Sequence, residues 1–363
     1  MHCARRPAKL SLAAIVTSCA AFFLAFPALA DDTIVTSDVT DPVEFDRIQE
    51  SAETGFVYPV TSTCKPPIWV GGVEATFLAP TISGKTVETG ILDVGAANAV
   101  GVIDDLGIET MTFAPRVWLG IDNDGWGLVS RFWYLNDTQY ASDNIPFGPD
   151  EFEFEGQNRL KLYTIDLEMT RSFRVYDCML QATFGARYAS FQYLSTLEQD
   201  AAFGTTLAGA GALSSRSFDG TGITFSLNGR HPLWRNSSLH WIWNARGSAI
   251  FGNAGYKVAA ENQLLDANGW VVAELGQRAD FNDTLLIAEL QTGLQWELSL
   301  QTIPATAFFR ILCEYQYWGG VNDVDLGIQN ITVGSTAEIG SAAYARGINL
   351  DLIGFSIAAG FTW

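Results

Sequence analysis

The chain has 363 residues, with 40 acidic and 21 basic side chains, so its formal net charge is −19 at pH 7. This excess of acid disfavours nucleic acid as a partner, because a polyanion is bound through Lys and Arg. Hydrophobic residues make up 48% of the chain, yet no segment after residue 30 has the roughly 18 unbroken apolar residues that a membrane-spanning helix needs. The apolar residues must therefore be placed by alternation in a sheet.

Residues 1–30 have the features of a secretory signal peptide. Arg5, Arg6 and Lys9 form the basic start, 10–26 the apolar run, and Ala28-Leu29-Ala30 the small-residue cleavage pattern. Cleavage after Ala30 would remove three basic residues and no acidic one, which changes the formal charge to −22. The sequence therefore predicts an exported protein.

A second interpretation of the leader takes 16–19 as a lipoprotein cleavage box with Cys19 as the lipid-bearing residue. The apolar run continues past Cys19, which favours the ordinary signal peptide. Residues 31–66 follow with little alternation and eight acids against Arg47 and Lys65. We expect them to form an acidic periplasmic leader or a plug segment.

Segments that alternate with period two begin after residue 66, as expected for strands with two unlike faces. We count ten strands in 67–363, and twelve would follow if two had been missed. They are placed at 67–80, 108–121, 126–136, 158–170, 178–193, 217–228, 239–256, 284–298, 305–318 and 347–363.

The connections between these segments alternate in length. Those expected to be long loops are 81–107, 137–157, 194–216, 257–283 and 319–346, whereas those between are short. In the first short connection, Asp124-Gly125 is a strong hairpin signal. Short periplasmic turns, long outer loops and an even strand count are typical of outer-membrane barrels. The sequence predicts an all-β fold, a transmembrane antiparallel up-and-down β-barrel, rather than a soluble sandwich.

The alternation separates an uncharged apolar face from a face that carries the charged side chains in the middle of the strands. Apolar residues expected to face lipid include Val117, Leu119, Ile121, Ile165, Leu167, Met169, Phe184, Ile223, Phe225, Phe251, Leu286, Leu290, Leu294, Phe309 and Ile311. The opposite, lumenal face carries Arg116, Arg131, Asp166, Glu168, Arg187, Arg246, Glu289, Glu297, Arg310 and Glu314. An Arg facing lipid at mid-depth would cost about 2–4 kcal/mol, so this parity suits a membrane barrel.

The ten lumenal charges have two interpretations. Five arginines and five carboxylates could form a structural network of ion pairs, or they could line a pore. A separate group of acids lies in the expected outer loop 137–157 and includes Asp143, Asp150, Glu151, Glu153 and Glu155. These acids either keep the loop solvated or concentrate cations at a channel mouth.

Several stretches together resemble the pore-forming outer-membrane protein family typified by the Legionella major outer-membrane protein. They are "WVGGVEATFLAP", "APRVWLGIDNDGWGLVSRFWYLND", "LKLYTIDLEMTRSF", "LQATFGARYASF" and the terminal "GFSIAAGFTW". The resemblance implies a porin in the outer membrane of a Gram-negative envelope. It also implies that Ile357, Phe361 and Trp363 form a C-terminal strand signal for the barrel-assembly machinery, with the last strand closing on the first.

No catalytic, cofactor or metal motif stands out. The chain after residue 30 holds His231 and His240 and three cysteines without metal-like spacing, and it shows no nucleophile elbow, zinc helix or phosphate loop. We therefore expect neither enzyme activity, nor a cofactor, nor a metal. An outer-membrane hydrolase is the third and least favoured class.

The sequence predicts an outer-membrane porin-like channel for passive diffusion of small hydrophilic solutes or ions. Its expected partners are membrane lipid, the assembly machinery and the solutes. The sequence is also compatible with a homo-oligomer. The alternative is a non-conducting barrel whose long acidic loops serve surface binding or envelope structure, since ten strands are close to the eight whose interior is filled by side chains.

Overall fold

The computed structural model describes 67–363, apart from short gaps at 83–86, 94–97, 105–109, 148–149, 177, 204–205, 235–236, 267–268, 301, 303, 323–324 and 334–336. The expected signal peptide and acidic leader, 1–66, lie outside the described residues. The described part belongs to one compact unit, Lys65–Trp363. Among the described residues, no helix is long and apolar enough to cross a membrane.

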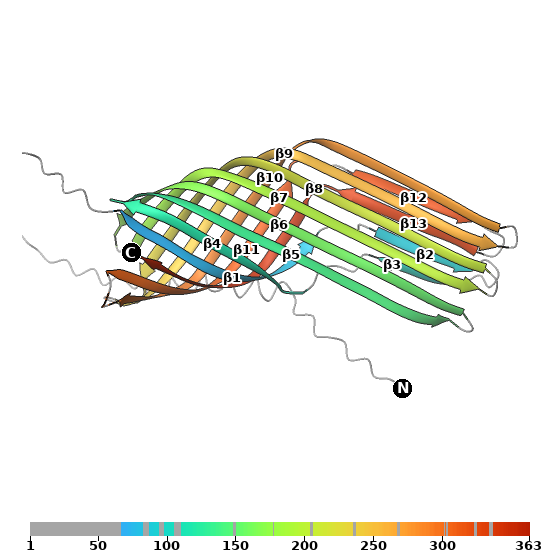
Figure 1. The fold of residues 1–363 in the computed structure, drawn as a ribbon, viewed down its shortest axis with the longest axis horizontal. Helices are drawn as coiled ribbons and strands as arrows, with labels where there is room; N and C mark the ends of the chain where they lie inside the picture. Colours follow the sequence, from blue (N-terminus) through green and yellow to red (C-terminus); the bar gives the residue numbers. More distant parts are fainter. Residues whose placement is uncertain are drawn as a thin grey trace, which may run out of the picture. The chain divides into compact units, whose positions relative to one another are not determined.

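Ten strands form a closed antiparallel barrel in the order β1-β14-β11-β10-β9-β8-β7-β6-β5-β4 (Figure 1). Their bounds are β1 Ile68–Ile82, β4 Thr112–Asn123, β5 Trp126–Phe147, β6 Asp150–Val175, β7 Cys178–Phe203, β8 Thr206–Pro232, β9 Leu239–Asp266, β10 Gly269–Leu300, β11 Ala305–Gly320 and β14 Asn349–Thr362. The predicted fold class and strand count are confirmed.

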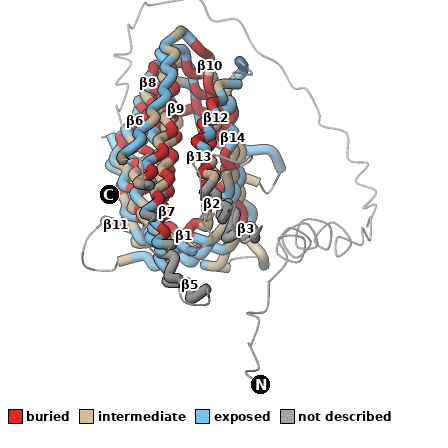
Figure 2. The backbone as a smooth tube through the Cα atoms, turned by 90° about the vertical axis from the view of Figure 1, so that its right-hand side faces the viewer, coloured by how far each residue is buried: buried red, intermediate tan, exposed pale blue. Residues whose placement is uncertain are grey.

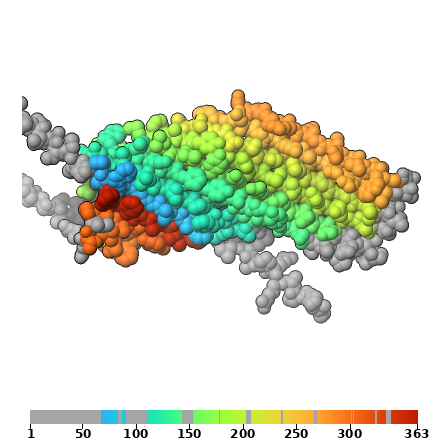
Figure 3. Space-filling view, in the orientation of Figure 1, coloured from blue at the N-terminus to red at the C-terminus, as the bar shows by residue number. Residues whose placement is uncertain are grey.

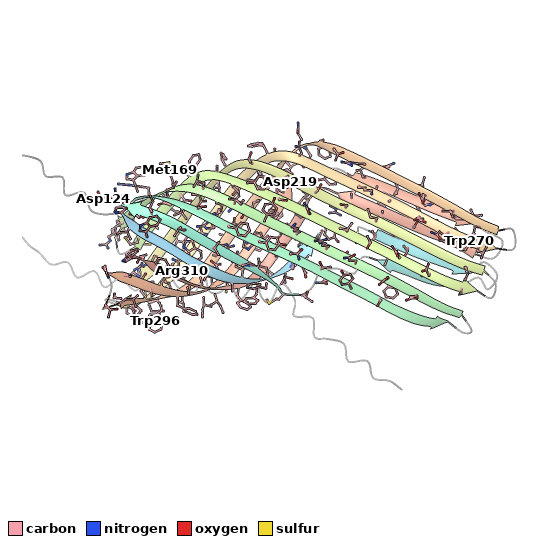
Figure 4. All side chains as sticks on the ribbon, viewed as in Figure 1. Asp124, Met169, Asp219, Trp270, Trp296 and Arg310 are labelled. Atoms are coloured by element: carbon pink, nitrogen blue, oxygen red, sulfur yellow. The ribbon has the colours of Figure 1, made fainter. Side chains whose placement is uncertain are left out.

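The first short connection forms as the sequence predicts. Asp124 and Gly125 both have positive φ, 54° and 81°, which a type I′ turn requires at its two central residues. The Gly125 N–H also donates to Asp122 Oδ1 at 3.0 Å. This turn joins β4 to β5 at the end of the barrel that also carries Trp296, whereas Trp270 marks the opposite tip (Figure 4). We call these the turn end and the far end.

The prediction of long loops at 137–157, 194–216 and 257–283 was wrong for the described residues, because the strands continue through these segments. β5 and β6 stay paired as far as Phe147 and Asp150, and β7 and β8 as far as Phe203 and Thr206. The glycine-rich run after 204 is part of β8. Six strands, β5–β10, therefore extend well beyond the other four as one tall sheet (Figure 1).

The other two expected loops, 81–107 and 319–346, also contain strands. They supply β2 Val87–Asp93, β3 Asn98–Asp104, β12 Asp325–Val333 and β13 Ala337–Arg346, which pair as a second sheet in the order β12-β13-β2-β3. This sheet lies against the tall sheet: β13 packs on β8 and β9, β12 on β9 and β10, and β2 on β7 and β8. The result is a two-layer sandwich that continues from one side of the barrel.

Polar side chains join the two layers of the sandwich. Asn262 on β9 donates from Nδ2 to the carbonyl oxygens of Asn330 and Ile339, at 3.0 and 3.1 Å. Asn330 in turn donates to the carbonyl oxygen of Ala273 on β10, at 2.7 Å. Between these contacts, small and branched apolar residues pack, and buried segments line both facing layers (Figure 2).

The outer face of the barrel carries the apolar residues that the alternation predicts. Val117, Leu119, Ile165, Phe225 and Ile311 are each 43–55% exposed although they are large and apolar. The strands form a continuous wall with no opening in the visible face (Figure 3). This outward band ends where the outward positions turn polar, as at Asp219 on β8.

The last strand closes the barrel on the first, as expected. β14 pairs with β1 over Val70–Ile82 and with β11 over Thr306–Gly319. Trp363 and Trp69 exchange two backbone hydrogen bonds, 2.8 Å from the Trp363 N–H and 2.5 Å from the Trp69 N–H. Ile357, Phe361 and Trp363 share the outer face and are 38, 46 and 59% exposed. Their role as an assembly signal stays a prediction.

Removal of residues 361–363 is expected to prevent formation of a folded barrel, because it deletes the Trp69 hydrogen bonds and the predicted signal together. The measurement is heat-modifiable gel mobility of the membrane-inserted protein. Trp363→Ala separates the two causes, since it keeps the backbone bonds, and Trp270→Ala at the far end is the matched control. A heat-modifiable barrel from the truncated chain would contradict the expectation.

Candidate functional site

The barrel interior is the candidate site, because every one of the ten predicted lumenal charges points into it. Arg116, Asp166, Glu168, Arg187, Arg246, Glu289 and Glu314 are buried, and Arg131, Glu297 and Arg310 are partly buried. Strand register makes several of them direct cross-strand neighbours: Arg131 with Asp166, Asp166 with Arg187, and Arg246 with Glu289. Opposite charges in such positions attract each other.

The largest ion-pair cluster lies on β6, β7, β9 and β10. Arg187 holds both oxygens of Asp166, at 2.6 and 2.9 Å, and its Nη1 lies 2.5 Å from Glu289 Oε1. Arg246 contacts the same Asp166 at 2.8 Å and Glu168 at 3.1 Å. These side chains are at most 9% exposed, so each charge depends on its partners rather than on water.

A second cluster lies on β1, β4 and β11. Arg116 Nη1 is 2.6 Å from Glu74 Oε1, and its Nη2 is 2.5 Å from Glu314 Oε1. Gln291 donates to both carboxylates, at 3.3 and 3.0 Å. Nearer the turn end, Arg230 and Glu297 form a half-exposed pair at 2.5 Å.

Two further lumenal charges, Glu74 and Arg230, were not predicted from the sequence. Each shares the parity of the predicted lumenal charges, and Glu74 is the direct cross-strand neighbour of Arg116. With them, the set of predicted charges becomes six arginines and six carboxylates, and Asp122 on β4, which also lines the interior near the turns, adds one more acid. The missed signal was cross-strand charge complementarity between the first and second barrel strands.

Toward the far end, the inward side chains become apolar. Leu78, Leu135, Leu160, Leu162, Ala114, Ala189, Leu285, Leu350, Leu352 and Trp318 are 0% exposed, and Phe191, Trp133 and Ile287 are at most 2% exposed. They belong to the same apolar cluster as residues of the sandwich, such as Val258 and Ala343. A plug of side chains from the barrel strands themselves therefore fills this half of the described interior.

Two indoles mark the boundary between the charged and the apolar layers. The rings of Trp133 and Trp318 lie 6.0 Å apart, and Trp133 Nε1 donates to Thr76 Oγ1 at 3.4 Å. The cavity at this level, lined by both indoles, Arg187 and Glu289, measures about 10 Å³. A space of this size is at the limit for one water molecule.

A larger cavity of about 290 Å³ lies below this boundary, toward the turn end. Its wall includes Arg116, Arg131, Arg230 and Arg310 together with Gln291 and Gln295. We call it the turn-end cavity. Glu74 and Glu289 also line it, so acids and bases are mixed in its wall.

The acids predicted for the outer loop lie on the hairpin of β5 and β6. Glu153 and Glu155 are exposed strand residues of β6. The side chains of Asp143, Asp150 and Glu151 lie outside the described residues, although their backbone belongs to the same two strands.

Above the barrel, Tyr256 on β9 is buried between the two sandwich layers and stacks on Phe281 with ring centroids 5.4 Å apart. Burial, and then the negative charge of Asp283, raises the pKa of its phenol to about 12. Within the described residues, no group of three or more His, Cys, Asp or Glu could hold a metal ion. The residues around Tyr256 therefore form a packed core between the two sandwich layers.

No protein-family model and no curated protein matches the sequence. Similar solved structures include the outer membrane protease OmpT of Escherichia coli, at 10% identity over 80% of this chain and 96% of that chain, with a TM-score of 0.34. Others are the attachment invasion locus protein Ail of Yersinia pestis (9% identity, 81% and 98% covered, TM-score 0.20) and a FadL homologue of Pseudomonas aeruginosa (10%, 81% and 90%, TM-score 0.24).

Structures this distant do not indicate a function. The fold is defined by the strand pairing itself. That pairing defines a closed ten-stranded antiparallel barrel with an all-β extension. The resemblance to the Legionella major outer-membrane protein family is not confirmed by these comparisons and stays a prediction.

Replacement of Arg187 by Met is expected to lower the free energy of unfolding by about 3–5 kcal/mol, because it leaves the carboxylates of Asp166 and Glu289 short of a buried partner. Urea unfolding of the refolded protein in detergent measures this loss. The matched control is Arg278→Met, whose partner Asp280 is exposed on β10, and it should leave the unfolding free energy unchanged. Equal effects of the two substitutions would show that the network is not stabilising.

Proposed function

We propose that the protein is an outer-membrane barrel with a sealed interior that carries its β-sandwich outside the membrane for surface binding or envelope structure. The observation that carries this proposal is the apolar plug, because a passage for hydrophilic solutes cannot cross a layer of close-packed Leu, Phe and Trp side chains. The protein would reach the outer membrane through the predicted signal peptide and the barrel-assembly machinery.

The membrane position is supported by the outward band of large apolar residues. A closed barrel leaves no strand edge in the hydrocarbon, and large exposed apolar residues around its wall suit lipid better than water. Trp69, Trp126, Trp296 and Trp363 are 44–59% exposed near the turn end. Tyr163, Tyr188 and Tyr315 lie on the outer face toward the far end, so aromatic residues border both sides of the band.

The proposed orientation is supported by the unequal size of the two ends of the barrel. Short turns are typical of the periplasmic side and large protein segments of the outside, which supports a turn end in the periplasm and a sandwich beyond the outer leaflet. The outward positions above the band agree, since Lys161, Gln157 and Glu155 on β6 alternate there with buried residues.

Surface binding is supported by an open edge of the sandwich. β10 pairs with β11 only from Leu285 onward, so its stretch 269–284 has a strand neighbour, β9, on one side only. Trp270, Val272 and Leu275 on this stretch are 48–59% exposed. Asn330 occupies the Ala273 carbonyl and the Val321 N–H occupies the Thr284 carbonyl, so the edge is open in part. Its exposed apolar residues offer a template for an added strand from a partner.

A porin-like channel remains the second candidate because of the turn-end cavity. Its polar wall and its volume of about 290 Å³ resemble the start of an aqueous path on the turn-end side. A conducting state would require the plug to move, since the level of Trp133 and Trp318 leaves only about 10 Å³.

Single-channel recording in a planar bilayer separates the two candidates. The sealed barrel is expected to give no discrete current steps, while heat-modifiable mobility shows that the same preparation is folded. An open porin inserted in the same bilayers is the positive control. Reproducible steps that persist after dilution of detergent would overturn the sealed barrel and support passive diffusion.

Labelling of intact cells tests the orientation. Trp270→Cys at the far end should react with a membrane-impermeant maleimide, whereas Trp126→Cys at the turn end should react only after the outer membrane is opened. The unsubstituted chain gives the background from the native thiols. Labelling of the Trp126 position alone on intact cells would mean that the barrel is inserted the other way round.

A further inference from the structure

The turn-end cavity has features of a binding site that the sealed barrel does not need. Its wall runs from Asp122 and Ser172 near the turns to Arg116 and Glu289 at mid-barrel. The plug lies directly beyond it, so the cavity is closed on the far-end side and opens toward the turn end. Its volume of about 290 Å³ is near the lower end of the range for small-molecule sites.

The four arginines in the wall differ in how firmly they are paired. Arg116 is held by Glu74 and Glu314, and Arg230 by Glu297, all at 2.5–2.6 Å. Among the described residues, Arg131 has one ion pair, at 3.8 Å to a Glu168 that also contacts a second arginine, Arg246, at 3.1 Å. A distance of 3.8 Å is too long for a hydrogen bond, so the donors of Arg131 are available.

Arg310 has no carboxylate within salt-bridge distance among the described residues. Its Nε donates to Gln295 Oε1 at 2.5 Å, and no described residue accepts a hydrogen bond from its Nη groups. The guanidinium lies over the rings of Phe308 and Trp118, with its Cζ 4.3 and 5.8 Å from their centroids. The two rings fix the plane of the guanidinium and leave its fork of donors for the cavity.

The charges are also unevenly distributed. The cluster of Asp166, Glu168, Glu289, Arg187 and Arg246 sums to −1, and the cluster of Glu74, Glu314 and Arg116 also sums to −1. The Arg230–Glu297 pair is neutral, so Arg131 and Arg310 carry a charge of +2 that no cluster offsets, and the acid of the cavity wall that belongs to no cluster is Asp122 near the turns. Both line the turn-end cavity, whereas each carboxylate of the two clusters lies within 3.1 Å of an arginine nitrogen.

We propose that the turn-end cavity binds a small carboxylate-bearing solute, with Arg310 as the principal ligand and Arg131 as the second cation. A carboxylate matches the planar fork of a guanidinium and accepts two hydrogen bonds from it. Gln295 Nε2 donates to Glu297 Oε1 at 2.5 Å, and its second amide hydrogen can orient the rest of a small polar molecule. The solute enters from the turn-end side, since the plug closes the other, and its binding requires no conduction.

Isothermal titration of the refolded protein in a neutral detergent, at constant ionic strength, tests the site with succinate as the probe. The unsubstituted chain should bind succinate, Arg310→Gln should bind about tenfold more weakly or worse, and Arg131→Gln should also weaken binding. Arg278→Gln, on the exposed far end, is the matched control and should bind as the unsubstituted chain does. Heat-modifiable mobility of each variant shows that it is folded.

Two results would overturn the proposal. One is the absence of succinate binding by the unsubstituted chain, and the other is equal affinity of Arg310→Gln and Arg278→Gln. A short peptide with a free C-terminus and its amidated form are titrated in parallel. Binding of the free peptide but not of succinate would assign the carboxylate to a peptide end and overturn the small solute. Conductance is measured separately, so a failed titration leaves the sealed barrel standing.

Discussion

The interior of a closed barrel must be filled, and this constraint determines most of the structure. Ten strands enclose slightly more space than the eight whose side chains just fill a barrel. Near the turn end, long arginine side chains reach across that space and meet carboxylates from strands far apart in sequence, such as Glu74 and Glu314. Toward the far end, Leu, Phe and Trp side chains fill it instead. Charge pairing and apolar packing thus complete one interior.

The apolar layer also explains how the barrel and the sandwich fit together. Inward positions on β7, β8 and β9 stay mostly apolar beyond the level where the other strands end, although polar side chains such as Asn262 lie among them. Their inner face would be exposed without a cover. The segments between β1 and β4 and between β11 and β14 supply that cover as the second sheet. Because the same cluster includes Leu352 in the barrel and Ala343 in the sandwich, the two regions share one core.

Alternation in the sequence was sufficient to predict the barrel strands, the turns at which they start and the shared parity of the ten lumenal charges. It could not show where strands end, because segments such as 194–216 alternate small and polar residues that also suit a loop. It also could not assign the plug: Leu160 and Leu162 share the parity of Asp166 and Glu168, and a period of two does not reveal where one face changes from polar to apolar. Contacts across the barrel, such as Arg116 with Glu314, depend on register and closure.

The continuity of the tall strands has a mechanical consequence. β9 runs from Leu239 to Asp266 without a break, and the last 15 residues after Phe251, about 50 Å along the strand, extend beyond the outward apolar band. Hydrogen-bonded strands with a common core provide no hinge. A force applied at Trp270 is therefore transmitted as a bending moment to the barrel wall, and the tip can change direction only when the whole barrel tilts.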